Sequence, residues 1–210
     1  MYILSQAEQF EKSENKIYYV DAGILEEQYL DAGYQRHERC YKIIYQYSEY
    51  TIICPEFRNP SIGAEPVVII PDFLVPKRPY PIEAYLYAIG LYGSTPEMGQ
   101  RKAAEATRIR FGLPTFAHTT LGRALKSLAG RLDKAGIKVP GAAAGQPATA
   151  GTAGKGRQSE FPKAQATMVL RKLAALFLRG AAAQPDLRSA AAACRETARK
   201  WYKEHQCFLL

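Results

Sequence analysis

The hydrophobic pattern divides the chain into a β-rich first third and a helical remainder. Residues 41–54 (YKIIYQYSEYTIIC) are dense in β-branched and aromatic side chains, which favour strands, and residues 46–49 form a turn between two arms. The shorter runs Lys16–Val20 and Val67–Ile70 are also typical of strands. Four prolines between residues 71 and 81 then favour an extended connector. The pattern predicts a small antiparallel β module.

Helical spacing begins after these prolines. Apolar residues from 82 to 92 recur three and four positions apart, as on one buried helix face, and Gly93 is predicted to end that helix. A second helix is expected to begin with a cap at Ser94 or Thr95 and to end at Gly112. These signals predict two consecutive helices.

A third helix is predicted from a cap at Thr119 to about Ala135. Its buried face is predicted to consist of Leu121, Leu125, Leu128 and Leu132, and its other side is largely basic.

The stretch 141–158 is built from Gly, Ala, Thr and Pro and lacks large apolar residues, so it cannot offset its own ordering entropy. Two helices are predicted beyond it, over 162–179 and 185–205. The chain is therefore expected to be an α+β protein. Its predicted parts are a β-rich module (1–76), a helix-turn-helix-like segment (77–140), a flexible linker (141–160) and a helical hairpin (161–210).

Charge is unevenly distributed along the chain. Residues 1–65 hold six Lys/Arg and eleven Asp/Glu, whereas the remainder holds twenty-two and nine. A basic remainder suggests an anionic partner, although a solvated surface has the same composition. The four cysteines are far apart, no signal peptide is evident and no apolar run is long enough to span a bilayer. These features predict a cytoplasmic protein without a membrane partner.

Residues 95–132 have the layout of a helix-turn-helix DNA reader, in which the second helix enters the major groove. Thr119, Thr120 and Arg123 are predicted to read base edges. The remaining predicted DNA-binding residues are Arg101, Lys102, Arg108, His118, Lys126 and Arg131. The predicted partner is therefore duplex DNA.

Two features leave alternatives open. The connection Gly112–His118 is longer than the turn of a compact helix-turn-helix motif. The basic side could also serve only to solvate a helical bundle. In that case the protein would be an adaptor whose helical hairpin packs on a partner, or on a second copy to form a homodimer.

Metal binding and catalysis are less well supported by the residues. His37, Cys40 and Cys54 are candidate zinc ligands around the predicted hairpin, but a structural zinc needs four ligands and Phe57 stands where a second cysteine would complete a knuckle. A metal-dependent nuclease would need several converging carboxylates, and Asp72 alone sits at a predicted strand end. The sequence therefore predicts no metal, no cofactor and no enzyme activity.

Cys54–Leu132 resembles an uncharacterised family of clostridial-type bacterial proteins that look transposon-associated. The segments that carry the resemblance are Ile53–Glu56, Ile70–Pro76, Arg101–Ala104 and Phe116–Ala124. The resemblance implies a zinc-ribbon-like module, degenerate in this chain, followed by a helix-turn-helix-like segment in a mobile element. It implies no catalytic residue.

Overall fold

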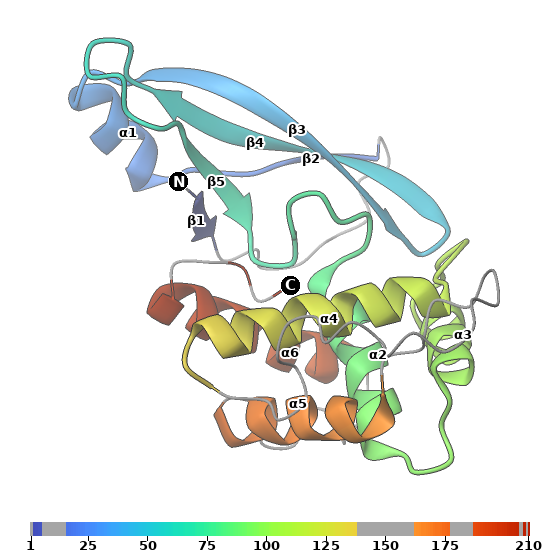
Figure 1. The fold of residues 1–210 in the computed structure, drawn as a ribbon. Helices are drawn as coiled ribbons and strands as arrows, with labels where there is room; N and C mark the ends of the chain where they lie inside the picture. Colours follow the sequence, from blue (N-terminus) through green and yellow to red (C-terminus); the bar gives the residue numbers. More distant parts are fainter. Residues whose placement is uncertain (1, 6–15, 138–161, 177–186, 206–207, 209) are drawn as a thin grey trace, which may run out of the picture. The chain divides into compact units, whose positions relative to one another are not determined.

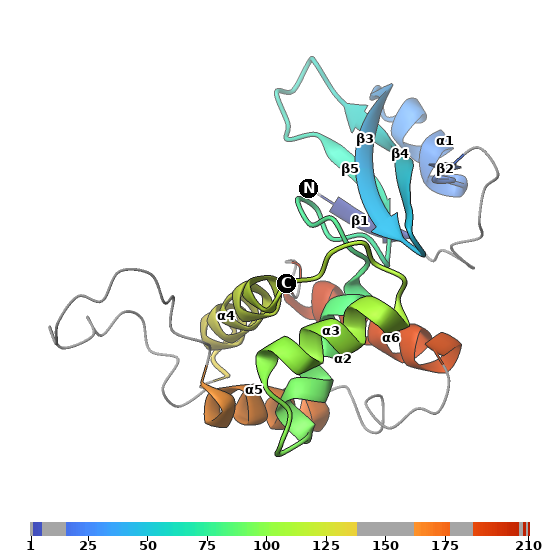
Figure 2. The same ribbon diagram turned by 90° about the vertical axis from the view of Figure 1, so that its right-hand side faces the viewer.

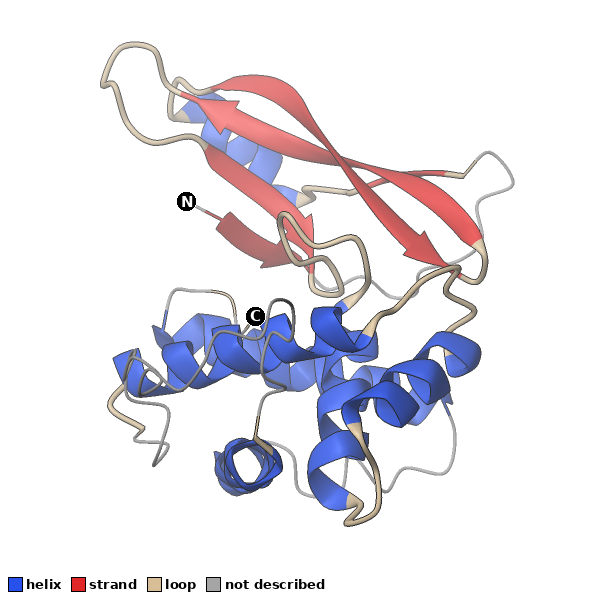
Figure 3. Cartoon of the chain, turned by 45° about the vertical axis from the view of Figure 1, so that its right-hand side comes forward, coloured by secondary structure: helices blue, strands red, loops and turns tan. Residues whose placement is uncertain are grey.

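The computed structural model describes residues 2–5, 16–137, 162–176, 187–205, 208 and 210 (Figure 1). The chain divides into two compact units, Met1–Ile82 with Gly112–Pro114, and Glu83–Phe111 with Thr115–Leu210. The described strands belong to the first unit and most of the described helices to the second (Figure 3), which confirms the α+β class. The predicted linker, 141–160, lies outside the described residues.

The first unit is built around a long antiparallel hairpin of β3 (Gln35–Tyr45) and β4 (Ser48–Arg58), paired along its whole length. The predicted hairpin is confirmed and is longer than its apolar centre suggested. Gln46 and Tyr47 form the tip with φ values of 46° and 59°. Residues other than glycine rarely adopt this left-handed backbone conformation, so the backbone at the tip is locally strained.

Three shorter strands complete a five-stranded sheet on the other edge of β4. They are β1 (Tyr2–Ser5), β2 (Ile17–Tyr19) and β5 (Val67–Pro71). β2 runs parallel to the first half of β4, β5 runs antiparallel to its second half, and β1 runs parallel to β5. The expectation of a purely antiparallel module was therefore wrong, because strands distant in sequence join the hairpin as parallel neighbours.

Both faces of the sheet carry packed side chains. On one face, Tyr18 of β2 meets Phe73 edge to face, with ring centroids 6.0 Å apart, beside the buried Ile52 of β4. On the other face, helix α1 (Ile24–Asp31) stacks Tyr29 on Phe57 at 5.0 Å. The prediction of an extended proline-rich connector was wrong, because the connector turns twice: the Leu74 amide donates to the Pro71 carbonyl and the Arg78 amide to the Val75 carbonyl. The Pro79 carbonyl accepts a 2.7 Å hydrogen bond from the Ile44 amide.

The second unit holds five helices in its described residues (Figure 2). They are α2 (Ile82–Ser94, whose first residue belongs to the first unit), α3 (Gln100–Arg110), α4 (His118–Lys134), α5 (Lys163–Leu176) and α6 (Leu187–His205). Most of α2 is buried, as its apolar sequence requires. Lys163 attaches α5 to the end of α2. Its ammonium donates to the carbonyls of Thr95 and Met98 and lies 4.9 Å from the centroid of the Tyr92 ring.

The predicted helix caps were wrong. α2 continues past Gly93 to Ser94, whose hydroxyl donates to the Gly90 carbonyl of the same helix. α3 and α4 follow Gly99 and Ala117, and neither N-cap residue has a side chain that bonds to the helix. Cap signals therefore misplaced both helix starts, whereas the predicted stop at Gly112 is confirmed by its φ of 57°.

Candidate nucleic-acid interface

Helix α4 is strongly amphipathic. Its apolar side is fully buried and comprises Leu121, Ala124, Leu125, Leu128, Ala129 and Leu132. The predicted leucine stripe is therefore confirmed as the core-facing side of the helix. A helix held along one side in this way presents its other side in a defined orientation.

The opposite side of α4 is exposed and mostly basic. Thr119, Arg123, Lys126 and Lys134 recur at helical spacing and are exposed; we call these four residues the α4 basic face. Gly130 continues the exposed stripe between Lys126 and Lys134. The face is nearly free of competing acid, because Asp133 is the sole carboxylate in the sequence of α4.

Three predicted site residues border this face rather than lie on it. Thr120 and Arg131 flank it on one side and His118 on the other, and all three are half-buried. These three residues lie at the margin of the α4 basic face, so the exposed face contains fewer of the predicted DNA-binding residues than the sequence suggested.

Helix α3 supplies the remaining predicted residues. Arg101 and Lys102 are exposed in its first turn. Arg108 instead forms a two-pronged ion pair with Glu105, at 2.7 and 2.9 Å, and this hydrogen bonding lowers the pKa of the Glu105 carboxyl. The charge of Arg108 is thus largely balanced within α3.

The N-terminal turns of α3 and α4 lie next to each other. A Cβ placed on Gly122 of α4 would lie 3.5 Å from the Gln100 side-chain oxygen of α3. Arg101 directly follows Gln100, and Arg123 directly follows Gly122. The structure therefore brings the basic first turn of α3 close to the start of the α4 basic face.

The long connection between α3 and α4 has a structural explanation. Its central residues, Gly112–Pro114, belong to the first unit. The Tyr47 amide at the hairpin tip donates a hydrogen bond to the Gly112 carbonyl. A Cβ on Gly112 would lie 2.9 Å from the Tyr47 ring and 3.0 Å from the Gln46 Cα. The connection is long because its centre packs against the tip of the β3–β4 hairpin.

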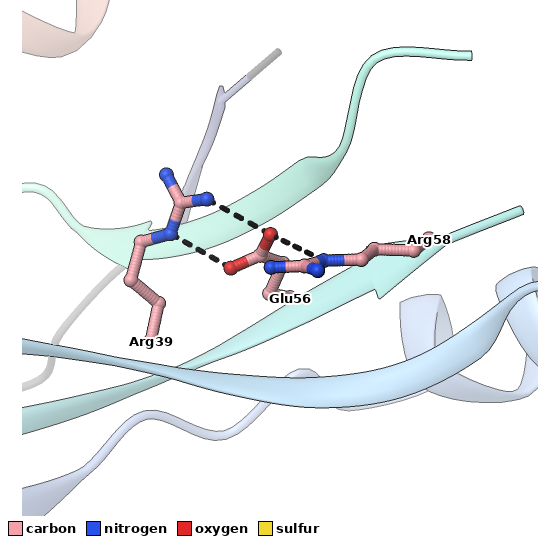
Figure 4. A network of polar contacts seen from close by, with 3 residues as sticks. All are labelled: Arg39, Glu56 and Arg58. Carbon is pink, nitrogen blue, oxygen red and sulfur yellow. Dashed lines mark hydrogen bonds and ion pairs between the residues drawn. The ribbon is translucent and has the colours of Figure 1, made fainter. Parts of the chain in front are cut away.

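A second polar cluster, which the sequence analysis missed, lies on the sheet (Figure 4). Glu56 is buried and accepts hydrogen bonds from Arg39 Nε and Nη2 at 2.7 and 2.8 Å and from Arg58 Nε at 2.9 Å. Burial by itself would raise the pKa of the Glu56 carboxyl, but the two guanidinium groups outweigh it and hold the pKa below its ordinary value. The same hydrogen bonds raise the pKa of Arg39.

The signal for this cluster lies in strand register. Arg39 pairs with Cys54 and is therefore diagonal to Glu56, on the same face of the hairpin. Residue spacing alone does not reveal such a cross-strand neighbour until the turn position is known.

The candidate zinc ligands do not come together. Cys40 pairs with Ile53, so its side chain lies on the face of the hairpin opposite to that of Cys54 and His37. Cys40 is exposed, whereas burial, with a smaller effect of Cys40, raises the pKa of the Cys54 thiol to about 12. Within the described part of the chain, no three His, Cys, Asp or Glu side chains converge as metal ligands. Asp72, which is buried, therefore belongs to no such group.

Apolar side chains of both C-terminal helices are buried. Ala166, Val169 and Trp201 are all buried. No helix among the described residues combines the length and hydrophobicity needed to cross a membrane.

Comparison with known proteins adds no relative. No protein-family model matches the chain, and no curated protein or solved structure matches it either.

Proposed function

We propose that the protein binds duplex DNA through the α4 basic face, with Arg101 and Lys102 of α3 as flanking phosphate contacts. The observation that carries this proposal is the exposure of Thr119, Arg123 and Lys126 on one side of a helix whose other side is buried. In a helix-turn-helix reader, the first turns of the second helix contact base edges while the preceding helix contacts the backbone.

The dimensions of the face fit this role. Thr119 and Lys126 are seven positions apart, about 10 Å along the helix axis, and an α-helix with its side chains is about 10–12 Å across. The major groove is about 12 Å wide and admits a single α-helix. Arg123 lies between these two residues and has the length and the forked donors that pair with guanine. A role as regulator or accessory factor of a bacterial mobile element, in the cytoplasm, is part of the same proposal.

A binding titration with random duplex DNA at about 50 and 200 mM salt tests the proposal. The four proposed phosphate contacts are Arg101, Lys102, Lys126 and Arg131. They predict that the affinity falls about a hundredfold over this range, because counterions are released on binding. A double variant, Arg123→Ala with Lys126→Ala, should bind more weakly and lose about one unit of salt slope, because Lys126 contacts phosphate whereas Arg123 contacts a base.

The matched control is Arg171→Ala with Lys172→Ala, which removes the same charge from two exposed positions of α5. This control should keep nearly the wild-type affinity and slope. Equal losses in the two double variants would reduce the proposal to general charge attraction. An affinity that does not respond to salt would contradict DNA binding.

A further inference from the structure

The Arg39–Glu56–Arg58 cluster carries more positive charge than its own carboxylate balances. Two guanidinium groups meet one buried carboxylate, whose side chain is 2% exposed, and the side chains of Arg39 and Arg58 are 37% and 53% exposed. A guanidinium has five N–H donors. Glu56 binds two nitrogen atoms of Arg39 and one of Arg58, so both arginines keep N–H groups beyond those that it uses.

Glu56 also determines how the two guanidinium groups are held. The two-pronged bond from Arg39 orients its planar fork, and the third bond holds Arg58 against the same carboxylate (Figure 4). Side chains that are already ordered lose less conformational entropy when they bind a ligand. His37 lies directly across the strand pair from Glu56, is exposed and shares the same face.

We propose that this cluster is a phosphate-binding site on the β3–β4 face, separate from the α4 basic face. Oriented guanidinium forks match the paired oxygens of a phosphate group, and the surplus positive charge favours a dianion over a neutral ligand. The phosphate belongs either to a nucleic-acid backbone or to a free phosphorylated compound. This proposal stands on the first unit alone and does not depend on DNA binding by α4.

The test is a titration of the full chain with inorganic pyrophosphate. Binding is monitored through the NMR signals of the arginine side-chain Nε–H groups. The Arg39 and Arg58 signals should shift and saturate. Arg58→Ala should weaken pyrophosphate binding about tenfold, the loss of one charge-assisted contact. It leaves the Arg39–Glu56 pair in place, so the variant should still fold, and far-UV circular dichroism checks this.

Arg36→Ala is the matched control. Arg36 lies on the same strand but on the opposite face, where it pairs with Glu26 at 2.6 Å. This variant should bind pyrophosphate as the wild type does. Shifts that do not saturate, or equal affinities of wild type and Arg58→Ala, would overturn the proposal.

A second titration, with a single-stranded oligonucleotide, separates the two sources of phosphate. If Arg58→Ala weakens binding of the oligonucleotide as well as of pyrophosphate, the site takes a nucleic-acid backbone. If only pyrophosphate binding weakens, the site takes a free phosphorylated compound. The α4 double variant leaves Arg39, Glu56 and Arg58 unchanged, so it should bind pyrophosphate as the wild type does. Weaker pyrophosphate binding in that variant would overturn the assignment of the phosphate to the β3–β4 face.

Discussion

Gly112→Ala perturbs the contact between the α3–α4 connection and the hairpin tip. Gly112 has a φ of 57°, and a Cβ at this position would lie 2.9 Å from the Tyr47 ring and 3.0 Å from the Gln46 Cα. The second of these atoms belongs to the backbone, so the crowding cannot be relieved by a side-chain rotation alone. The substitution therefore combines backbone strain with steric overlap.

The expected loss of unfolding free energy is about 2–4 kcal/mol. A left-handed conformation costs a non-glycine residue roughly 1–2 kcal/mol, and overpacking typically costs about 1–3 kcal/mol. Alanine returns about 0.4–1 kcal/mol because it restricts the unfolded chain. Gly63→Ala isolates the first of these effects, since Gly63 has nearly the same φ, 59°, and no atom lies within 4 Å of its added Cβ. Its expected loss is only about 1 kcal/mol.

The assay is urea unfolding of the wild type and both variants, followed by far-UV circular dichroism, together with amide hydrogen exchange at Tyr47. The Tyr47 amide bonds to the Gly112 carbonyl, so its protection should fall in Gly112→Ala and stay unchanged in Gly63→Ala. Gly130→Ala, at an exposed helical position with open space around its Cβ, should stabilise by about 0.5–1 kcal/mol. Equal losses for Gly112→Ala and Gly63→Ala would refute the packing described for the connection.

Three further predictions follow from the two polar regions and the cysteines. Arg123→Ala should weaken binding to a DNA site selected from a random pool by about 1–3 kcal/mol and relax one base position; unchanged affinity in a mobility-shift titration would remove Arg123 as a base reader. Glu56→Gln should destabilise the protein by about 1–3 kcal/mol at pH 7. Because the pKa of Glu56 is lowered on folding, its contribution is complete above about pH 4.3 and is lost as the pH falls further, so urea unfolding should show variant and wild type converging in acid. Iodoacetamide at pH 8 should modify exposed Cys40 and spare Cys54, whose thiol pKa is raised to about 12; peptide mapping that finds both modified in the folded protein would contradict the burial of Cys54.

Periodicity predicted the elements that bury a long apolar face. The spacing of Ile82–Tyr92 and of the α4 leucines identified α2 and α4, because burial on one side of a helix leaves a pattern that local sequence contains. Periodicity did not predict strand β1 or helix α1, for a physical reason. β1 has four residues, and α1 has none that is fully buried, so neither shows a distinct apolar face.

Hydrophobic periodicity could not predict contacts between residues that are distant in the sequence. Strand β1 pairs with β5 and strand β2 pairs with β4, both in parallel, and the sequences of these partners carry no local signal for each other. Arg39, Glu56 and Arg58 become a cluster only through the register of the hairpin. The length of the α3–α4 connection was visible in the sequence, but its cause required the contact with Tyr47.

The basic residues of the candidate interface were predicted by composition and spacing, and the structure divides them. Arg123 and Lys126 are exposed on one face, whereas Arg131 lies at its margin and Arg108 is paired with Glu105. Side-chain ion pairing of this kind depends on rotamers, which spacing alone does not determine.

Site-specific photo-crosslinking tests the central claim, that the α4 basic face contacts duplex DNA, most directly. A photoreactive amino acid replaces Lys126 in one protein and Lys172 of α5 in another, since both positions are exposed and carry the same charge. The account predicts crosslinks to a duplex from position 126 that disappear as salt rises, and few from position 172. Equal crosslinking from both positions, or crosslinking from position 172 alone, would contradict it.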